Sequence, residues 1–124
     1  MFYVSTGGKP NQPAHVSAAD LIACGIDGVE LSGGLYDPEQ ESKVLQLSEV
    51  VDLQLHNYFP PAPIPFVLNL ASLDPQIVEA SLAHAQSAID LAAQVGSRYY
   101  GIHAGFLIDP SVEFLGRAFD GSEL

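Results

Sequence analysis

The sequence predicts an α/β fold in which parallel strands alternate with helices. Short apolar runs recur along the chain, several of them end in glycine or histidine, and a helical segment separates each run from the next. Four strand units separated by three helical units imply parallel pairing in sequential order, with right-handed crossovers that place the helices on one face of the sheet. A length of 124 residues and a hydrophobic content of 48% suit a single domain over residues 1–124.

The first strand and the first helix lie within the first 25 residues. Residues 2–8, FYVSTGG, are typical of a short apolar strand that ends in glycines. Residues 17–25, SAADLIACG, predict a helix with Ser17 as its N-cap and Gly25 as its stop.

The second strand and the second helix follow directly. Residues 27–34, DGVELSGG, predict a strand that again ends in glycines. Residues 37–50, DPEQESKVLQLSEV, predict a helix in which Asp37 is the N-cap and Pro38 takes the first helical position, with acidic residues in the first turn.

The remaining elements are a strand, a long helix and a fourth strand. Residues 51–59, VDLQLHNYF, predict the third strand, and a proline-rich loop separates it from a helix that begins at DPQIVEASL. Gly96 ends this helix, and residues 98–108, RYYGIHAGFLI, predict the fourth strand. The residues that follow the helical period are Ile77, Val78, Ser81, Leu82, Ala85, Ala88, Ile89 and Ala92.

Two histidines follow neighbouring strands of the predicted sheet, at the point where each strand ends. His56 ends the third strand and His103 ends the fourth, so one strand–helix–strand unit separates them. Because the carboxyl ends of parallel strands meet at one edge of a sheet, we expect the two imidazoles to lie side by side and to share a ligand or a water. Each histidine could instead have a structural, hydrogen-bonded role.

Three further polar residues are candidates for the same edge. Glu30 lies in an otherwise apolar strand, where burying an unpaired charge costs free energy. Its carboxylate could contact a substrate or a metal ion. Alternatively, it could have a structural hydrogen-bonding role. Asn57 and Asn69 flank the proline-rich loop, and each either binds a substrate hydroxyl or caps loop backbone.

Other residues that could carry chemistry have plainer interpretations. His84 falls on the polar side of the long helix and is expected to be solvated, and His15 lies in a loop where a surface position is expected. Cys24 lies among apolar residues and is expected in the core. The segment PPAPIP, residues 60–65, suits a rigid rim or lid loop better than a proline-rich ligand motif.

Charge and composition restrict the partners. Four Lys and Arg face fifteen Asp and Glu, for a formal net charge of −11, which argues against binding a nucleic-acid backbone. The net negative charge does not exclude a small anionic substrate, because a bound divalent metal ion can make the electrostatic potential at the site positive. One cysteine permits no internal disulfide, and no apolar stretch approaches the length of a membrane span, so we expect a cytoplasmic protein without a membrane partner.

Several segments resemble one known superfamily. The segments GIDGVELSGG, LQLHNYFPPAPIPFVLNLAS and YYGIHAGF resemble the xylose-isomerase-like barrel superfamily, which contains sugar phosphate isomerases and epimerases and endonuclease IV. The resemblance covers the chain from Met1 to about Asp109. It implies the first four βα units of a (β/α)8 TIM barrel.

The resemblance also implies a metal site that this chain does not complete. In endonuclease IV the histidines that end the third and fourth strands bind zinc, a role that carries over to His56 and His103. The family's other ligands and its catalytic carboxylates lie on later strands, so the ligand set for Mn, Mg or Zn is expected to be incomplete here, since catalytic zinc usually has three protein ligands. We expect either a missing C-terminal half or a half-barrel that pairs with a second copy as a homo-oligomer.

Three classes of function follow from these observations. The first is an isomerase or epimerase of a sugar or sugar phosphate, with Glu30 as the catalytic carboxylate, His56 and His103 at the metal, and Asn57 and Asn69 at the substrate. The second is an endonuclease IV-like zinc phosphodiesterase acting on abasic DNA, and the third is a non-catalytic interaction module. On the first interpretation, the 124-residue chain alone is expected to be inactive.

Overall fold

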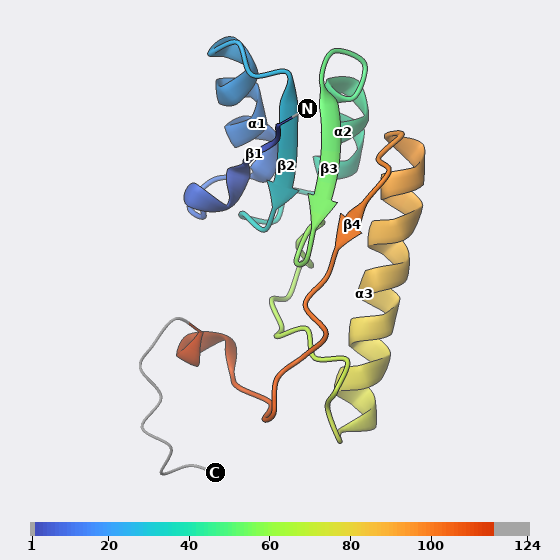
Figure 1. The fold of residues 1–124 in the computed structure, drawn as a ribbon. Helices are drawn as coiled ribbons and strands as arrows, with labels where there is room; N and C mark the ends of the chain where they lie inside the picture. The colour runs from blue at the N-terminus through green and yellow to red at the C-terminus, as the bar shows by residue number, and fades with distance from the viewer. Residues whose placement is uncertain (1, 116–124) are drawn as a thin grey trace.

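Four parallel strands form one sheet in the order of the sequence, β1-β2-β3-β4 (Figure 1). The computed structural model describes residues 2–115. Each of the three neighbouring strand pairs is parallel, which confirms the predicted pairing and order. The strands are β1 Val4–Ser5, β2 Gly28–Ser32, β3 Asp52–His56 and β4 Tyr100–Gly101.

One helix follows each of the first three strands. The helices are α1 Ala14–Ala23, α2 Gln40–Leu47 and α3 Pro75–Gln94, with short 3-10 turns at Thr6–Gly8 and Val112–Phe114. The Asp74 side chain accepts a hydrogen bond from the backbone N–H of Gln76, and Pro75 takes the first position of α3, so this helix begins with a regular N-cap. None of the helices within residues 2–115 combines the length and apolarity that crossing a membrane requires.

The core lies between one face of the sheet and all three helices. Alternate residues of β2 and β3 point to this face and are buried, because successive side chains of a strand point to opposite sides. The prediction that the helices cover one face is therefore confirmed. The buried apolar cluster comprises Ala14, Ala18, Val29, Leu31, Val44, Val51, Leu53, Leu55, Phe59, Leu91 and Ala92.

The opposite face of the sheet is polar and partly exposed. Glu30 and Ser32 of β2 and Gln54 and His56 of β3 point to this side. The register pairs Glu30 with Gln54, and Ser32 with His56, so the four side chains form two adjacent rows. The described helices pack on the other side, and the His56 and Glu30 side chains on this polar face are 30% and 26% exposed.

The edge strands are much shorter than predicted. In residues 2–8 only two residues are in β1, and the glycines continue into a 3-10 turn. In residues 98–108 only Tyr100–Gly101 pair with β3. The sheet formed by the described residues is open, with β1 and β4 at its edges, and its class is α/β with a four-stranded parallel sheet.

The structure differs from both helix N-caps predicted in the first half of the chain, Ser17 and Asp37. Helix α1 begins at Ala14 after Pro13, so Ser17 lies inside the helix, where it is buried and its Oγ accepts a hydrogen bond from Gln12 Nε2 at 2.7 Å. The predicted Ser17 cap is wrong, because α1 already begins at Ala14, with Pro13 in the N-cap position and no side-chain cap. Asp37 Oδ1 accepts from the Glu39 N–H at 2.8 Å, as a cap does, but Pro38 precedes α2, which begins two residues later.

The buried face of α3 includes only some of the residues that follow the helical period. Leu82 and Ile89 follow the helical period in the sequence, yet they are 58% and 50% exposed. The buried residues of α3 are Ser81, His84, Ala88, Leu91 and Ala92. Cys24, expected in the core, is exposed at the end of α1. The apolar neighbours of Cys24 in the sequence suggested a core position, and this prediction is wrong.

Candidate functional site

The two strand-end histidines lie side by side at the carboxyl edge of the sheet. His56 is the last residue of β3, and His103 follows β4 by two residues. Their ring centroids are 5.2 Å apart and the ring planes meet at 74°, an edge-to-face arrangement. The predicted proximity of the two imidazoles is confirmed, and their role as metal ligands stays a prediction.

The Glu30 carboxylate lies beside the same imidazole, on the polar face of the sheet. Its Oε1 is 3.7 Å from His56 Nδ1, and Ser32 Oγ is 3.4 Å from the same nitrogen. Glu30 and His56 are a charged pair when the imidazole is protonated. In the neutral tautomer that carries its proton on Nδ1, this proton faces these oxygens and the lone pair of Nε2 is available to a ligand.

A glycine makes room for the His56 ring. A Cβ placed on Gly101 would lie 2.8 Å from Cδ2 of His56, closer than such atoms approach. The imidazole therefore lies directly over the backbone of β4, and a side chain at position 101 would displace it. Sequence reasoning did not single out Gly101, although a glycine within a predicted strand is a signal of such close approach.

Asn57 connects the ends of β3 and β4. It has a φ of +43°, which asparagine adopts more readily than most residues, and its backbone N–H donates to Gly101 O. Its side-chain Oδ1 accepts a hydrogen bond from the backbone N–H of His103 at 3.2 Å. Its carbonyl oxygen accepts from Tyr100 Oη at 2.8 Å and from His84 Nε2 at 3.1 Å.

Asn69 is buried, and its side-chain amide forms its hydrogen bonds with groups other than the two imidazoles. Its Nδ2 donates to Ile108 O at 3.2 Å and to Asp109 Oδ1 at 2.6 Å. Its Oδ1 accepts from the backbone N–H groups of Ala71 and Phe106. The amide thereby binds the segment after β4 to the loop before α3. A direct contact from Asn69 to a substrate stays a prediction.

His84 was expected in solvent, and this prediction is wrong. The residue is 8% exposed, and its ring stacks on Tyr58 at a centroid distance of 5.3 Å and meets Phe66 edge-on at 5.9 Å. Burial lowers the pKa of His84 below the usual 6.5, and the hydrogen bond to Asn57 opposes this shift. Burial also raises the pKa of Tyr100 to about 12, so its hydroxyl stays protonated at neutral pH.

The depressed pKa of His84 predicts a pH dependence of stability. Between the folded pKa and 6.5 the unfolded chain binds the proton more strongly than the folded chain, so the free energy of unfolding falls as the pH falls below 6.5. Urea unfolding at pH 7.5 and 5.5 should show a larger loss for the wild type than for His84→Gln. Ser87→Ala, a non-titrating change on the same helix, should keep the wild-type loss. Equal losses in wild type and His84→Gln would contradict this assignment.

His15 lies outside this site. It belongs to α1 instead of the predicted loop, its side chain is largely covered, and its Nε2 is 3.6 Å from Asp37 Oδ2.

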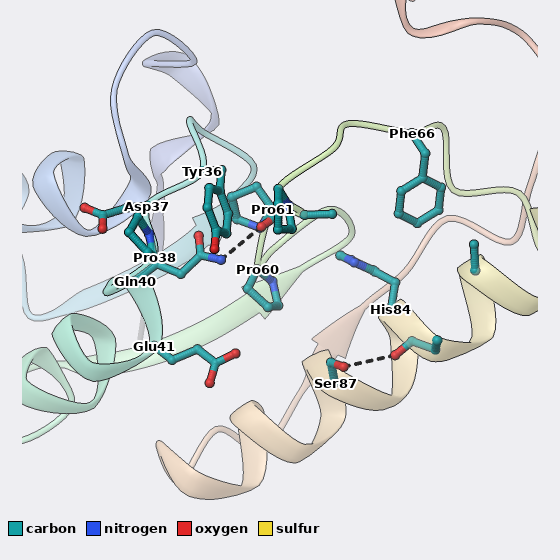
Figure 2. A pocket seen from close by; sticks show the side chains of 14 residues that line it. Tyr36, Asp37, Pro38, Gln40, Glu41, Pro60, Pro61, Phe66, His84 and Ser87 are labelled. Atoms are coloured by element: carbon teal, nitrogen blue, oxygen red, sulfur yellow. Dashed lines mark hydrogen bonds between the residues drawn. The ribbon is translucent and has the colours of Figure 1, made fainter.

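Two cavities lie close to these residues. A groove of about 480 Å³ runs between the start of α2, the prolines after β3 and helix α3 (Figure 2). Its rim includes Pro60 and Pro61, and Gln40 Nε2 donates to Pro61 O at 2.9 Å, in agreement with a fixed rim loop. A second cavity of about 260 Å³ is mostly apolar and is lined in part by Asn57 and His103.

The described residues bring together two imidazoles and one nearby carboxylate, but not a complete metal centre. Within residues 2–115, no three His, Cys, Asp or Glu side chains are placed to hold a metal ion together. Imidazole and carboxylate are nonetheless donors that suit zinc and manganese. The chemistry of the pair therefore fits part of a metal site.

Comparison with known proteins supports the fold. No protein-family model matches the chain, and no curated protein matches it. Among solved structures, it is similar to the TTHB071 protein from Thermus thermophilus, solved after soaking with ZnCl2, with a TM-score of 0.54 and 23% sequence identity. The match covers 85% of this chain and 39% of that chain, so the chain spans well under half the length of the structure that it resembles.

Proposed function

We propose that this chain forms one wall of the active site of a sugar or sugar-phosphate isomerase or epimerase with a divalent-metal site. We further propose that its four strands are the first part of a xylose-isomerase-like barrel. The observation that carries the proposal is the edge-to-face pair of His56 and His103, with ring centroids 5.2 Å apart, and Glu30 beside His56 on a partly exposed polar face.

The residues of this wall have distinct roles in the proposed reaction. Glu30 is the carboxylate that accepts a proton from a hydroxyl-bearing carbon of the sugar and returns it to the neighbouring carbon. His56 and His103 hold either the metal or the substrate oxygens, and Glu30 orients His56 through Nδ1. Asn57 and Asn69 are the proposed contacts to substrate hydroxyls. A divalent metal, when bound, polarises the carbonyl and hydroxyl pair of the substrate.

The metal site requires ligands beyond the described residues. Two imidazoles supply fewer protein ligands than a catalytic zinc usually has. The zinc soak of the similar Thermus protein makes zinc the first ion to test, together with manganese and magnesium.

The net charge favours a small substrate over a nucleic acid. A formal charge of −11 repels a DNA backbone, whereas one phosphate of a sugar can be balanced by a single bound cation. A sugar phosphate is therefore the preferred candidate substrate over abasic DNA.

Ligand titration observed by NMR tests the proposal on the 124-residue chain. With zinc present, a ketose phosphate is expected to shift the backbone amide signals of Asn57, Gly101 and His103, because these residues surround the two imidazoles. His103→Ala should weaken these shifts, and an oligonucleotide duplex with an abasic site should leave them unchanged. Shifts caused by the duplex alone would favour a phosphodiesterase, and no shift with either ligand would favour a non-catalytic module.

A further inference from the structure

We propose that His84 and Tyr100 are positioning residues that act through Asn57 to set the separation of His56 and His103. This inference rests on the proposed function for its biological meaning. The geometry that it describes can be tested without any substrate. Neither residue touches the polar face of the sheet where the proposed reaction would take place, so neither is a catalytic residue.

Two side-chain donors hold one carbonyl oxygen at the end of β3. Tyr100 Oη lies 2.8 Å from Asn57 O, and His84 Nε2 lies 3.1 Å from the same atom. A carbonyl oxygen can only accept, so His84 must carry its proton on Nε2. Together the two hydrogen bonds fix the orientation of the peptide group that follows Asn57.

The same asparagine fixes the position of His103. Its Oδ1 accepts from the backbone N–H of His103 at 3.2 Å, and its own N–H donates to Gly101 O. It also follows His56 directly in the chain. A rotation of the Asn57 peptide would therefore change the path of the chain after His56 and the hydrogen bond that holds His103.

The two donors are themselves held in place by different parts of the fold. The ring of His84 packs against Tyr58 and Phe66 and is almost fully buried on α3. Tyr100 is half-buried in β4, where its partner across the sheet is Leu55. Helix α3 and strand β4 thus converge on one backbone carbonyl, which is a more rigid arrangement than either hydrogen bond would give alone.

A set of matched variants separates positioning from general stability. His84→Leu and Tyr100→Phe each remove one donor and keep an apolar group of similar size. His84→Gln keeps an amide N–H that can reach the place of Nε2 and should rescue the contact. Tyr99→Phe is the control for the tyrosine change, because Tyr99 is the adjacent residue and is 68% exposed.

The first readout is the nuclear Overhauser contact between the ring protons of His56 and His103 in the folded, metal-free chain. The wild type, His84→Gln and Tyr99→Phe should show this contact, and His84→Leu and Tyr100→Phe should lose it and shift the His103 amide signal. The second readout is zinc affinity, which should weaken about tenfold in the two donor-removing variants.

The inference is overturned if Tyr100→Phe, or His84→Leu where it folds, keeps both the native ring contact and the native His103 signal. If His84→Leu does not fold, Tyr100→Phe decides the question. A wild-type chain that binds no zinc would argue against the proposed function. The ring contacts would still decide whether His84 and Tyr100 set the geometry.

Discussion

The 124-residue chain is expected to show no measurable isomerisation of ketoses or their phosphates, with zinc, manganese or magnesium. Proton transfer to and from carbon needs a base on one side of the substrate and an electrophile held against its oxygens. The described residues supply one wall of such a site, with Glu30, His56 and His103 on it. Since a misplacement of about 1 Å can cost roughly 100-fold in rate, a site with one wall should be slower by orders of magnitude.

The assay uses a panel of ketoses and ketose phosphates with each metal in turn. Turnover by the isolated chain that His103→Ala abolishes would contradict this prediction, because it would show that the described wall suffices for catalysis. Turnover that His103→Ala leaves unchanged would point to a contaminating enzyme.

Replacing Leu55 by alanine is expected to reduce the free energy of unfolding by about 3 kcal/mol. Leu55 is 0% exposed and lies in the centre of the sheet, between Leu31 of β2 and Tyr100 of β4. The loss combines the apolar surface returned to water with the cavity left behind. Urea unfolding measures it directly.

Leu73→Ala is the matched control, because Leu73 is 100% exposed before α3. Its effect should stay within about 0.5 kcal/mol. Equal losses in the two variants would mean that the helices do not pack on Leu55 as described.

The sequence was sufficient to predict the parallel sheet and the proximity of the two histidines. Both follow from one regularity: when strands and helices alternate, the carboxyl ends of neighbouring strands meet at one edge. His56 and His103 therefore came together although a whole strand–helix–strand unit separates them in the chain. The placement of Glu30 on the same face follows from the two-residue period of a strand, which separates it from the buried Val29 and Leu31.

Other features depended on tertiary packing that a pattern does not contain. The helical period puts His84 on the polar side of α3, which predicts exposure to solvent. In the structure the rings of Tyr58 and Phe66 pack against its imidazole, and the carbonyl of Asn57 accepts its hydrogen bond. Gly101 matters because one specific ring from another strand lies over it. Contacts of this kind join residues that are far apart in the sequence, so they can be identified only once the strands and helices are placed relative to one another.

The two edge strands were overestimated for a related reason. Apolar residues near Tyr3 and Ile102 suggested long strands, yet only two residues of each segment pair with the sheet. Each edge strand has a neighbour on one side within the described residues, and regular pairing ends where glycines and turns begin. Apolar character predicts the existence of a strand better than its length.

Cobalt(II) titration of the chain, observed by its visible absorption, tests most directly whether His56 and His103 bind one metal ion together. We expect the wild type to bind cobalt with imidazole coordination, and His15→Ala, at a histidine away from the pair, to bind it equally well. The double variant His56→Ala/His103→Ala should lose more than about 100-fold in affinity, since it removes the ligands themselves and not a residue behind them. Cobalt binding that is absent in the wild type, or unchanged in the double variant, would contradict the proposed metal site.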